Sequence, residues 1–393
     1  MQKFRSWFKL YFRETDKLLL FLCLCASAFG MLLIFSATRG GAQGIPRDFK
    51  VMLIAVCVGV LLCLLISFID YEVIVRLWPL IALFCILIMC SLFFWGKAPD
   101  ARQDARSWLD LGGFYFQPSE LVKIGFIITF AVHLDAVKDH VSKFTTVLLL
   151  GLHGIIPIGL VMATGDDGSA LIFMLIFLGM MFAAGVHWGY FAAGFAAIAV
   201  AFPAIWALGD KFLLSQDQKN RFLAVLYPDL YAKSEAFQQN RGIGAIGSGQ
   251  LFGQGLFNGN YTQSGAVPAN ENDFVFSVAG EELGFIGAMA VLVLLAAIIL
   301  RIIVNGKRAN DNASYLMCMG MAAMLGAQLV INIGMVLQWL PVIGITLPFF
   351  SAGGSSNLCI YVGVGLMMSI YRFNQKTPAA NFRLQRVVTR FTT

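Results

Sequence analysis

Residues 51–69 read VMLIAVCVGVLLCLLISFI, a run without a single charged side chain. About twenty apolar residues suffice to cross the hydrocarbon core of a bilayer as one helix. The whole chain of 393 residues is 59% hydrophobic and 13% charged, whereas about 25% of the residues of a soluble domain are charged. The composition therefore excludes a soluble enzyme, a nucleic-acid-binding domain and a disulfide-stapled secreted domain.

Ten apolar runs of this kind follow one another along the chain. They are continuous, whereas the strands of a membrane β-barrel alternate apolar and polar residues. We therefore expect an all-α polytopic membrane protein with about ten transmembrane helices, the fourth of them starting before its apolar run. The runs are Leu18–Ala37, Val51–Ile69, Leu77–Trp95, Leu121–Leu134, Phe144–Ala163, Ser169–Val186, Trp188–Leu208, Phe274–Val304, Tyr315–Leu337 and Asn357–Tyr371.

Three segments organise the chain around these runs. Residues 1–17 interleave basic and aromatic side chains, typical of a segment lying against anionic lipid. Residues 18–371 form the transmembrane domain, and residues 372–393 form a basic tail. The side that holds both termini carries the excess of Lys and Arg, which predicts cytoplasmic termini.

This orientation places a large loop, residues 209–273, outside the cell between the seventh and eighth runs. A connection of this length without an apolar span usually has a function. Its glycine run, Gly242–Gly249, indicates either a flexible loop or backbone that approaches a ligand closely.

Cysteine and histidine give no sign of a metal site. The eight cysteines lie within apolar runs and the four histidines are scattered, with neither CxxC nor HxxxH spacing. We expect free thiols and no tightly bound zinc or haem.

Charged side chains at membrane depth are candidates for function. Glu120 and Lys123 open the fourth run three residues apart, on one face of a helix. They form either an internal ion pair that orders the bundle or part of a polar active-site cavity. Asp166 and Asp167 occupy a turn before the sixth run and are either exposed or ligands of a cation.

Asp273 directly precedes the eighth run, at the outer boundary of the membrane. A carboxylate poised between lipid and water can act as a general base, or it can serve as an interfacial cap or ion-pair partner. Arginines of the outer loops, such as Arg106 and Arg221, have the fork geometry that suits pyrophosphate oxygens, although isolated loop cations are often only solvated.

Six stretches resemble signatures of the SEDS family (shape, elongation, division and sporulation), to which FtsW and RodA belong. They occur in the family's order and cover most of the chain from the third run onward. They are ARSWLDLG at 105–112, QPSELVK at 117–123, AIGSG at 245–249, NDFVFSVAGEELGF at 272–285, NIGM at 332–335 and LPFFSAGGSS at 347–356.

The resemblance implies ten spans, cytoplasmic termini and a large extracellular loop before the eighth span. It also implies a peptidoglycan glycosyltransferase that polymerises lipid II at the outer face of the bacterial cytoplasmic membrane and releases undecaprenyl pyrophosphate. The implied partner is a class B penicillin-binding protein. Mg²⁺ or Mn²⁺ held mainly by substrate phosphates would leave no all-protein ligand motif.

The family's functional positions can be located in this chain. They are Asp273 for the essential loop acid, Trp108 for the aromatic residue of the first outer loop, Glu120 and Lys123 for the polar pair, and Arg106 and Arg221 for two outer arginines.

The chain departs from the family near the essential acid. The family's Pro-Glu-x-His-Thr-Asp reads PANEND at 268–273, so only its two ends survive. The stretch Leu251–Gly259 looks closer to RodA than to FtsW.

Two other functions stay open on the sequence alone. A non-catalytic scaffold for a penicillin-binding protein needs no acid at the outer boundary. A lipid II flippase needs a polar path through the bundle, for which the candidates are Glu120, Lys123, His153, Gln328 and Asn332.

Overall fold

The computed structural model describes residues 14–39, 44–98, 106–112, 114–212 and 215–376. Within these ranges one helix occupies the position of each of the ten expected spans, which confirms the fold class. They are α2 (Lys17–Arg39), α3 (Arg47–Phe68), α5 (Trp78–Trp95), α6 (Pro118–Ala136), α7 (Phe144–Ala163), α8 (Asp167–Ala183), α9 (Trp188–Phe212), α13 (Val275–Lys307), α14 (Asn312–Val336) and α15 (Gly354–Lys376).

Eight of these helices are long and apolar enough to cross a membrane, counted over the described residues. The other two are α8, which is apolar but has only 17 residues, and α6, which carries the charges of Glu120 and Lys123. As expected, α6 begins before its apolar run, at Pro118. Proline suits the first position of a helix because its missing N–H would have no partner there.

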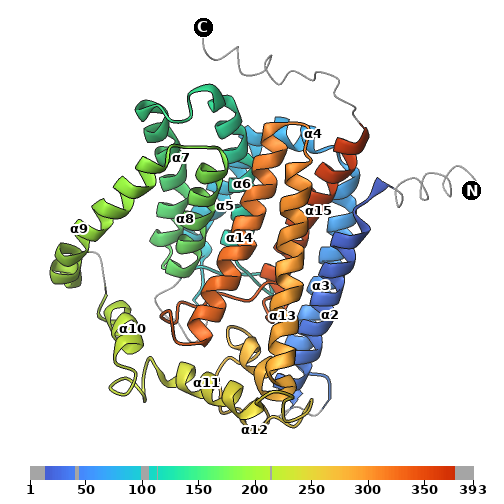
Figure 1. The fold of residues 1–393 in the computed structure, drawn as a ribbon, viewed down its shortest axis with the longest axis vertical. Coiled ribbons are helices and arrows are strands. Elements are labelled where there is room, and N and C mark those ends of the chain that lie inside the picture. Colours follow the sequence, from blue (N-terminus) through green and yellow to red (C-terminus); the bar gives the residue numbers. More distant parts are fainter. Residues whose placement is uncertain (1–13, 40–43, 99–105, 113, 213–214, 377–393) are drawn as a thin grey trace, which may run out of the picture.

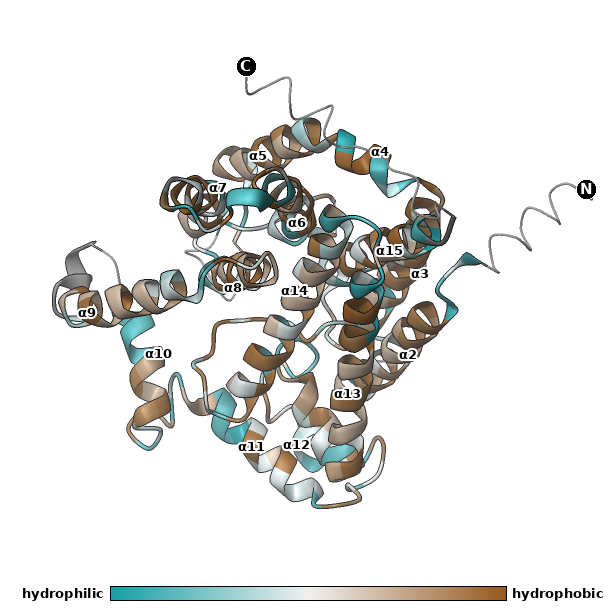
Figure 2. Ribbon diagram, turned by 45° about the horizontal axis from the view of Figure 1, so that its top comes forward, coloured by the Kyte–Doolittle hydropathy of each residue, from teal (hydrophilic) through white to brown (hydrophobic). Residues whose placement is uncertain are grey.

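The helices form a bundle whose enclosure varies widely (Figure 1). The apolar window of α15 is 83% buried, and this helix packs along α3. By contrast, α9 stands apart from the bundle in both views, and its apolar window is 0% buried (Figures 1 and 2). In a membrane, α9 therefore presents its apolar side chains to lipid.

The two ends of the bundle differ in character. One end holds the start of α2, the end of α15 and the short helices α4 (Tyr71–Arg76) and η1 (Lys138–His140). The large loop caps the opposite end, hereafter the outer end (Figure 1). The expected segment 1–17 and tail 372–393 lie mostly outside the described residues, since only 14–17 and 372–376 belong to them.

The large loop contains three helices separated by irregular segments. It contains α10 (Gln216–Leu226), α11 (Phe237–Gly249) and α12 (Asn260–Gln263). The run Gly242–Gly249 lies within α11 and packs against α13, so the expectation of a flexible loop was wrong. A Cβ atom at Gly249 would lie 2.0 Å from the carbonyl oxygen of Gly280. The glycines therefore allow two helix backbones to touch.

Helix α13 is broken at Gly284, where φ is 68° and ψ is −163°. Loop residues fill the break. The N–H groups of Phe285 and Ile286 donate to the carbonyls of Gln250 and Leu251 over 2.9 and 3.3 Å. The N–H groups of Gln254 and Gly255 donate to the carbonyls of Glu281 and Glu282 over 2.9 and 3.0 Å. The loop thus satisfies the backbone groups that the break leaves open, as membrane depth requires.

Gly249→Ala should destabilise the protein by about 1–3 kcal/mol, because the added methyl group overlaps the Gly280 carbonyl and forces α11 away from α13. Thermal unfolding in detergent micelles measures the change. Gly247→Ala is the matched control in the same helix, since nothing lies within 4 Å of its Cβ position. Equal melting temperatures for the two variants would contradict this packing.

Candidate functional site

The expected polar pair forms a buried ion pair at the start of α6. Lys123 Nζ lies 2.8 Å from Glu120 Oε1, and the two side chains are 1% and 8% exposed. One helical turn separates them, as their spacing requires. Because each charge is removed from water, each needs the other for compensation.

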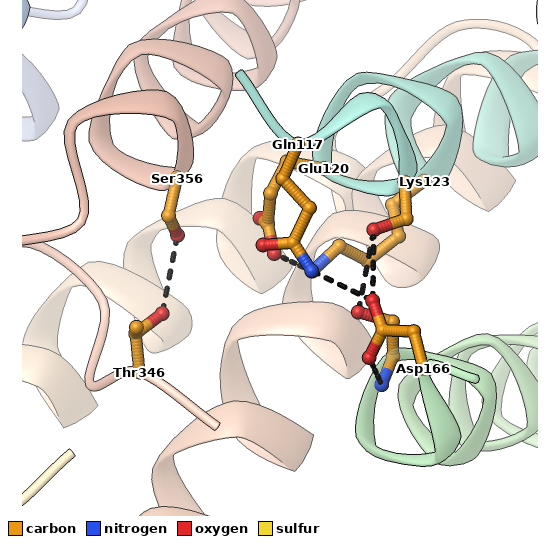
Figure 3. A network of polar contacts seen from close by, with 8 residues as sticks. Gln117, Glu120, Lys123, Asp166, Thr346 and Ser356 are labelled. Carbon is orange, nitrogen blue, oxygen red and sulfur yellow. Dashed lines mark hydrogen bonds and ion pairs between the residues drawn. The ribbon is translucent and has the colours of Figure 1, made fainter. Parts of the chain in front are cut away.

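Asp166 connects the start of this helix to the start of α8. Its Oδ2 accepts hydrogen bonds from Gln117 Nε2 at 2.6 Å and Ser119 Oγ at 3.3 Å (Figure 3). Its Oδ1 caps α8 by accepting from the Ser169 N–H at 3.0 Å. Asp166 is thus partly buried and bonded to protein donors, so the expectation of an exposed turn was wrong for it. Asp167 is exposed and accepts from Gln218.

A second polar pair faces this network from the other side. Thr346 Oγ1 and Ser356 Oγ lie 3.3 Å apart, and Figure 3 shows them across from Gln117 and Glu120. Thr346 belongs to the segment 337–353 between α14 and α15, and Ser356 to the first turn of α15. Polar groups from α6, α8, α15 and this segment therefore gather at the outer end of the bundle.

Backbone hydrogen bonds fix the position of Asp273 beside this region. Asn332 Nδ2 donates to the Asp273 carbonyl at 2.8 Å and to the Ile345 carbonyl at 2.7 Å. Ser351 Oγ donates to the Asn272 carbonyl at 2.6 Å. Because Ile345 precedes Thr346, Asn332 places Asp273 next to the segment that carries the second polar pair. The Asp273 side chain is partly buried.

Glu271 is a second acid in the same stretch. Its carbonyl accepts from the Ala352 N–H at 2.8 Å, and its Oε1 from Asn272 Nδ2 at 3.3 Å. Burial raises the pKa of the Glu271 carboxyl above its usual value, and the nearby carboxylate of Asp48 raises it further. Sequence reasoning assigned no role to Glu271, although its presence was visible as a departure from the family pattern.

Trp108 and Arg106 belong to a segment that covers the turn between α7 and α8. The backbone of Trp108 pairs with Lys97 in both directions, at 2.7 and 3.2 Å. Ser107 Oγ donates to the Thr164 carbonyl at 3.2 Å, two residues before Asp166. Trp108 is partly buried, whereas Arg106 is exposed. A short hairpin follows, with β1 (Leu109–Asp110) paired to β2 (Tyr115–Phe116).

Arg221 extends from α10 to the same segment that contains Thr346. Its Nη1 donates to the Val342 carbonyl at 3.3 Å. It also lines a cavity of about 310 Å³ whose apolar walls come from α7, α8, α10 and the segment between α14 and α15. The structure therefore places Arg221 at the outer end, against the segment that Asn332 joins to Asp273 through the Ile345 carbonyl.

Several residues of this region have roles that the sequence did not reveal. The sequence suggests Asn332 only as part of a polar path for a flippase. In the structure its side chain instead joins Asp273 to Ile345 by donating to both carbonyls. Ser351 accepts from the Leu347 N–H at 2.8 Å while it holds Asn272. Asn332 and Ser351 both lie in stretches that resemble SEDS signatures, and this resemblance is the sequence feature that could have marked them. Among the described residues, no three His, Cys, Asp or Glu side chains converge to hold a metal ion.

A family model described as "FTSW_RODA_SPOVE: Cell cycle protein" matches residues 16–376. The chain belongs to this family. The SEDS resemblance of the six sequence stretches is therefore confirmed, and the outer end described above is the outer end of an FtsW/RodA-type chain.

Relatives named MrdB and FtsW are similar to this chain over most of its length. The peptidoglycan glycosyltransferase MrdB of Escherichia coli K12 is 30% identical over 367 residues, covering 93% of this chain and 95% of MrdB. The probable peptidoglycan glycosyltransferase FtsW of Bacillus subtilis is 30% identical over 379 residues, covering 92% of this chain and 91% of that protein.

Solved structures share the fold. A chain from a peptidoglycan synthase complex, described as coordinating polymerization and crosslinking, gives a TM-score of 0.78 at 28% identity, covering 92% of this chain and 99% of that one. RodA of Thermus thermophilus gives a TM-score of 0.67 at 26% identity, covering 92% and 97%.

Breaking the buried pair of this FtsW/RodA-type chain from either side should cost about 3–5 kcal/mol, because an uncompensated charge stays buried. Glu120→Gln and Lys123→Met are the single variants, and thermal unfolding in micelles gives their stabilities. The double variant should lose much less than the sum of the two. Additive losses would show that the 2.8 Å contact carries no coupling energy.

Proposed function

We propose that this protein is a peptidoglycan glycosyltransferase that polymerises lipid II into glycan strands and releases undecaprenyl pyrophosphate. The observation that carries the proposal is Asp273, an acid whose backbone is fixed by Asn332 at the outer end of the bundle. Buried polar side chains surround this end, and the relatives named as peptidoglycan glycosyltransferases cover nearly the whole chain.

Asp273 is the proposed general base. The acceptor is a sugar hydroxyl of one lipid-linked molecule, and the donor is a second molecule whose anomeric carbon bears a pyrophosphate. As the hydroxyl oxygen attacks that carbon, Asp273 takes its proton and the carbon–pyrophosphate bond breaks with inversion of configuration. A rigid backbone favours this role, because a base must stay within hydrogen-bond reach of the proton it removes.

The departing pyrophosphate needs positive charge. Arg106 and Arg221 are the proposed sources within the chain, since guanidinium groups bind phosphate oxygens through paired hydrogen bonds. Mg²⁺ or Mn²⁺ bound mainly by substrate phosphates would neutralise the same charge.

Trp108 and the buried pair have supporting roles in this proposal. Trp108 is amphipathic and partly buried at the outer end, where it can stack on a sugar ring or shape the site. Glu120 and Lys123 order the start of α6, which holds Gln117 and Ser119 against Asp166.

The setting of the reaction follows from the same residues. We place the protein in the bacterial cytoplasmic membrane with both termini in the cytoplasm, in agreement with the distribution of Lys and Arg. A class B penicillin-binding protein is the proposed partner, since glycan strands must be cross-linked after polymerisation. The role we favour is RodA-like, in cell-wall elongation, with division as the alternative.

The flippase alternative requires open polar groups at membrane depth, and four of its five candidates are engaged inside the protein. The exception is Gln328, which is 1% exposed and whose Oε1 has no hydrogen-bond partner among the described residues. Glu120 pairs with Lys123. His153 Nδ1 lies 3.0 Å from His133 Nδ1. Asn332 is 0% exposed and bonded to two carbonyls. These contacts favour a catalytic role over a transport path.

Asp273→Asn should abolish polymerisation, because the amide keeps the shape of the side chain but cannot take the proton. The assay uses purified protein with and without its co-expressed partner, labelled lipid II and Mg²⁺, with glycan strands resolved on a gel. Asp229→Asn, which alters an exposed acid of the same loop, is the matched control and should keep full activity.

Polymer formed equally by Asp273→Asn would place the base elsewhere. No polymer from the unaltered protein, even with the partner, would contradict the proposed activity. A lipid II translocation assay and a partner-binding assay would then separate the flippase from the scaffold.

Removing divalent cations with EDTA should lower polymerisation at least tenfold, because the pyrophosphate would lose most of its charge compensation. Adding Mg²⁺ or Mn²⁺ in excess should restore it. The melting temperature without substrate should not change, since the proposed ion is held mainly by substrate. Full activity in EDTA would assign the compensation to the arginines alone.

A further inference from the structure

The large loop is attached to α13 through two adjacent carboxylates that the reaction itself does not use. Glu281 and Glu282 are both 0% exposed, and they stand immediately before the break at Gly284. We propose that Glu281 and Glu282 are positioning residues that hold the loop on the first half of α13 and thereby fix Asp273. This inference rests on the proposed role of Asp273 as the base.

Glu281 binds the start of α12. Its Oε1 accepts from the Tyr261 N–H at 2.7 Å, and its Oε2 accepts from the Thr262 N–H at 2.9 Å and from Thr262 Oγ1 at 2.7 Å. The first N–H groups of a helix have no partner within the helix. The carboxylate supplies one from a different helix, so it joins α12 to α13.

Glu282 binds two further elements. Its oxygens lie 2.7 and 2.6 Å from Ser36 Oγ on α2. They also accept from the Phe257 N–H at 3.1 Å and from Gln263 Nε2 at 2.9 Å. Glu282 therefore connects α13 with the first membrane helix and with both sides of α12.

These carboxylates depend on their donors. Among the described residues, neither of them forms an ion pair with Lys or Arg. A buried charge without a counter-ion is tolerable only when hydrogen bonds replace the lost water. Among the described residues, every hydrogen-bond donor to these two carboxylates belongs to the loop or to α2. If either segment moved away from α13, a buried carboxylate would lose the hydrogen bonds that replace its lost water.

A glycine allows the loop to come this close. A Cβ atom at Gly259 would lie 2.8 Å from Glu281 Oε2 and 2.9 Å from Glu282 Cγ. The half-helix Val275–Leu283 is thereby enclosed by α11, α12 and α2. Asp273 lies two residues before this half-helix, so the attachment of the loop to the half-helix also fixes the position of Asp273.

The first test is Glu281→Gln. The amide keeps the size of the carboxylate but presents N–H hydrogens to groups that themselves donate. We expect turnover on lipid II to fall at least tenfold and KM to change less than threefold, since the side chain does not face the substrate. Amide hydrogen exchange at Tyr261 and Thr262 should speed up, which reports the loss of attachment directly. Asp229→Asn is again the control.

A disulfide should rescue this variant if its defect is one of position. A Cβ atom at Gly242 would lie 3.0 Å from Ser277 Oγ, a separation compatible with a disulfide between these positions. Gly242→Cys with Ser277→Cys should therefore link α11 to the half-helix. In the Glu281→Gln background, oxidation should restore most of the turnover, and dithiothreitol should remove it again.

Two results would overturn the proposal: full turnover in Glu281→Gln, or a fully formed disulfide that restores nothing. Asp273→Asn, assayed in parallel, separates this proposal from the proposed function. If that variant polymerises lipid II, the assignment of the base fails, whereas the rescue still shows whether loop attachment controls turnover.

Discussion

The break in α13 at Gly284 leaves carbonyls on one side and N–H groups on the other without helical partners. Within a membrane these groups need partners from the protein, because lipid supplies none. Residues 250–255 of the large loop provide them through four backbone hydrogen bonds. The arrangement of α11, α12 and the outer half of α13 depends on this one requirement.

The candidate site inherits its rigidity from backbone contacts. Asn332 joins Asp273 to Ile345, and Ser351 holds Asn272, so the acid is fixed on the side facing α14 and α15. The loop fixes it on the other side through the half-helix Val275–Leu283. Polar side chains of α6 and α8 complete the region, with Asp166 as their common acceptor. These hydrogen bonds together hold the backbone of the candidate site in place at this end of the bundle.

The spans were predictable because lipid selects long apolar runs, and a run such as 51–69 permits few other structures. The buried pair was predictable from helical spacing alone. The role of the glycines at 242–249 was not predictable, because glycine suits a flexible loop and a close contact between helices equally well. Only the structure shows that Gly249 lies against Gly280 of another helix. Glu281 and Glu282 were likewise hidden, because their donors lie about 20 residues away along the chain or, for Ser36, 246 residues away.

That last separation has a consequence for biogenesis. Ser36 is synthesised with the first membrane helix, and six further spans follow before the helix that carries Glu282. Until then the large loop lacks the carboxylates that order it. Its assembly is therefore a late event, completed only when the last third of the chain enters the bilayer. In the orientation proposed above, a nascent chain arrested before α13 would carry an unfinished loop that extracellular proteases could cleave.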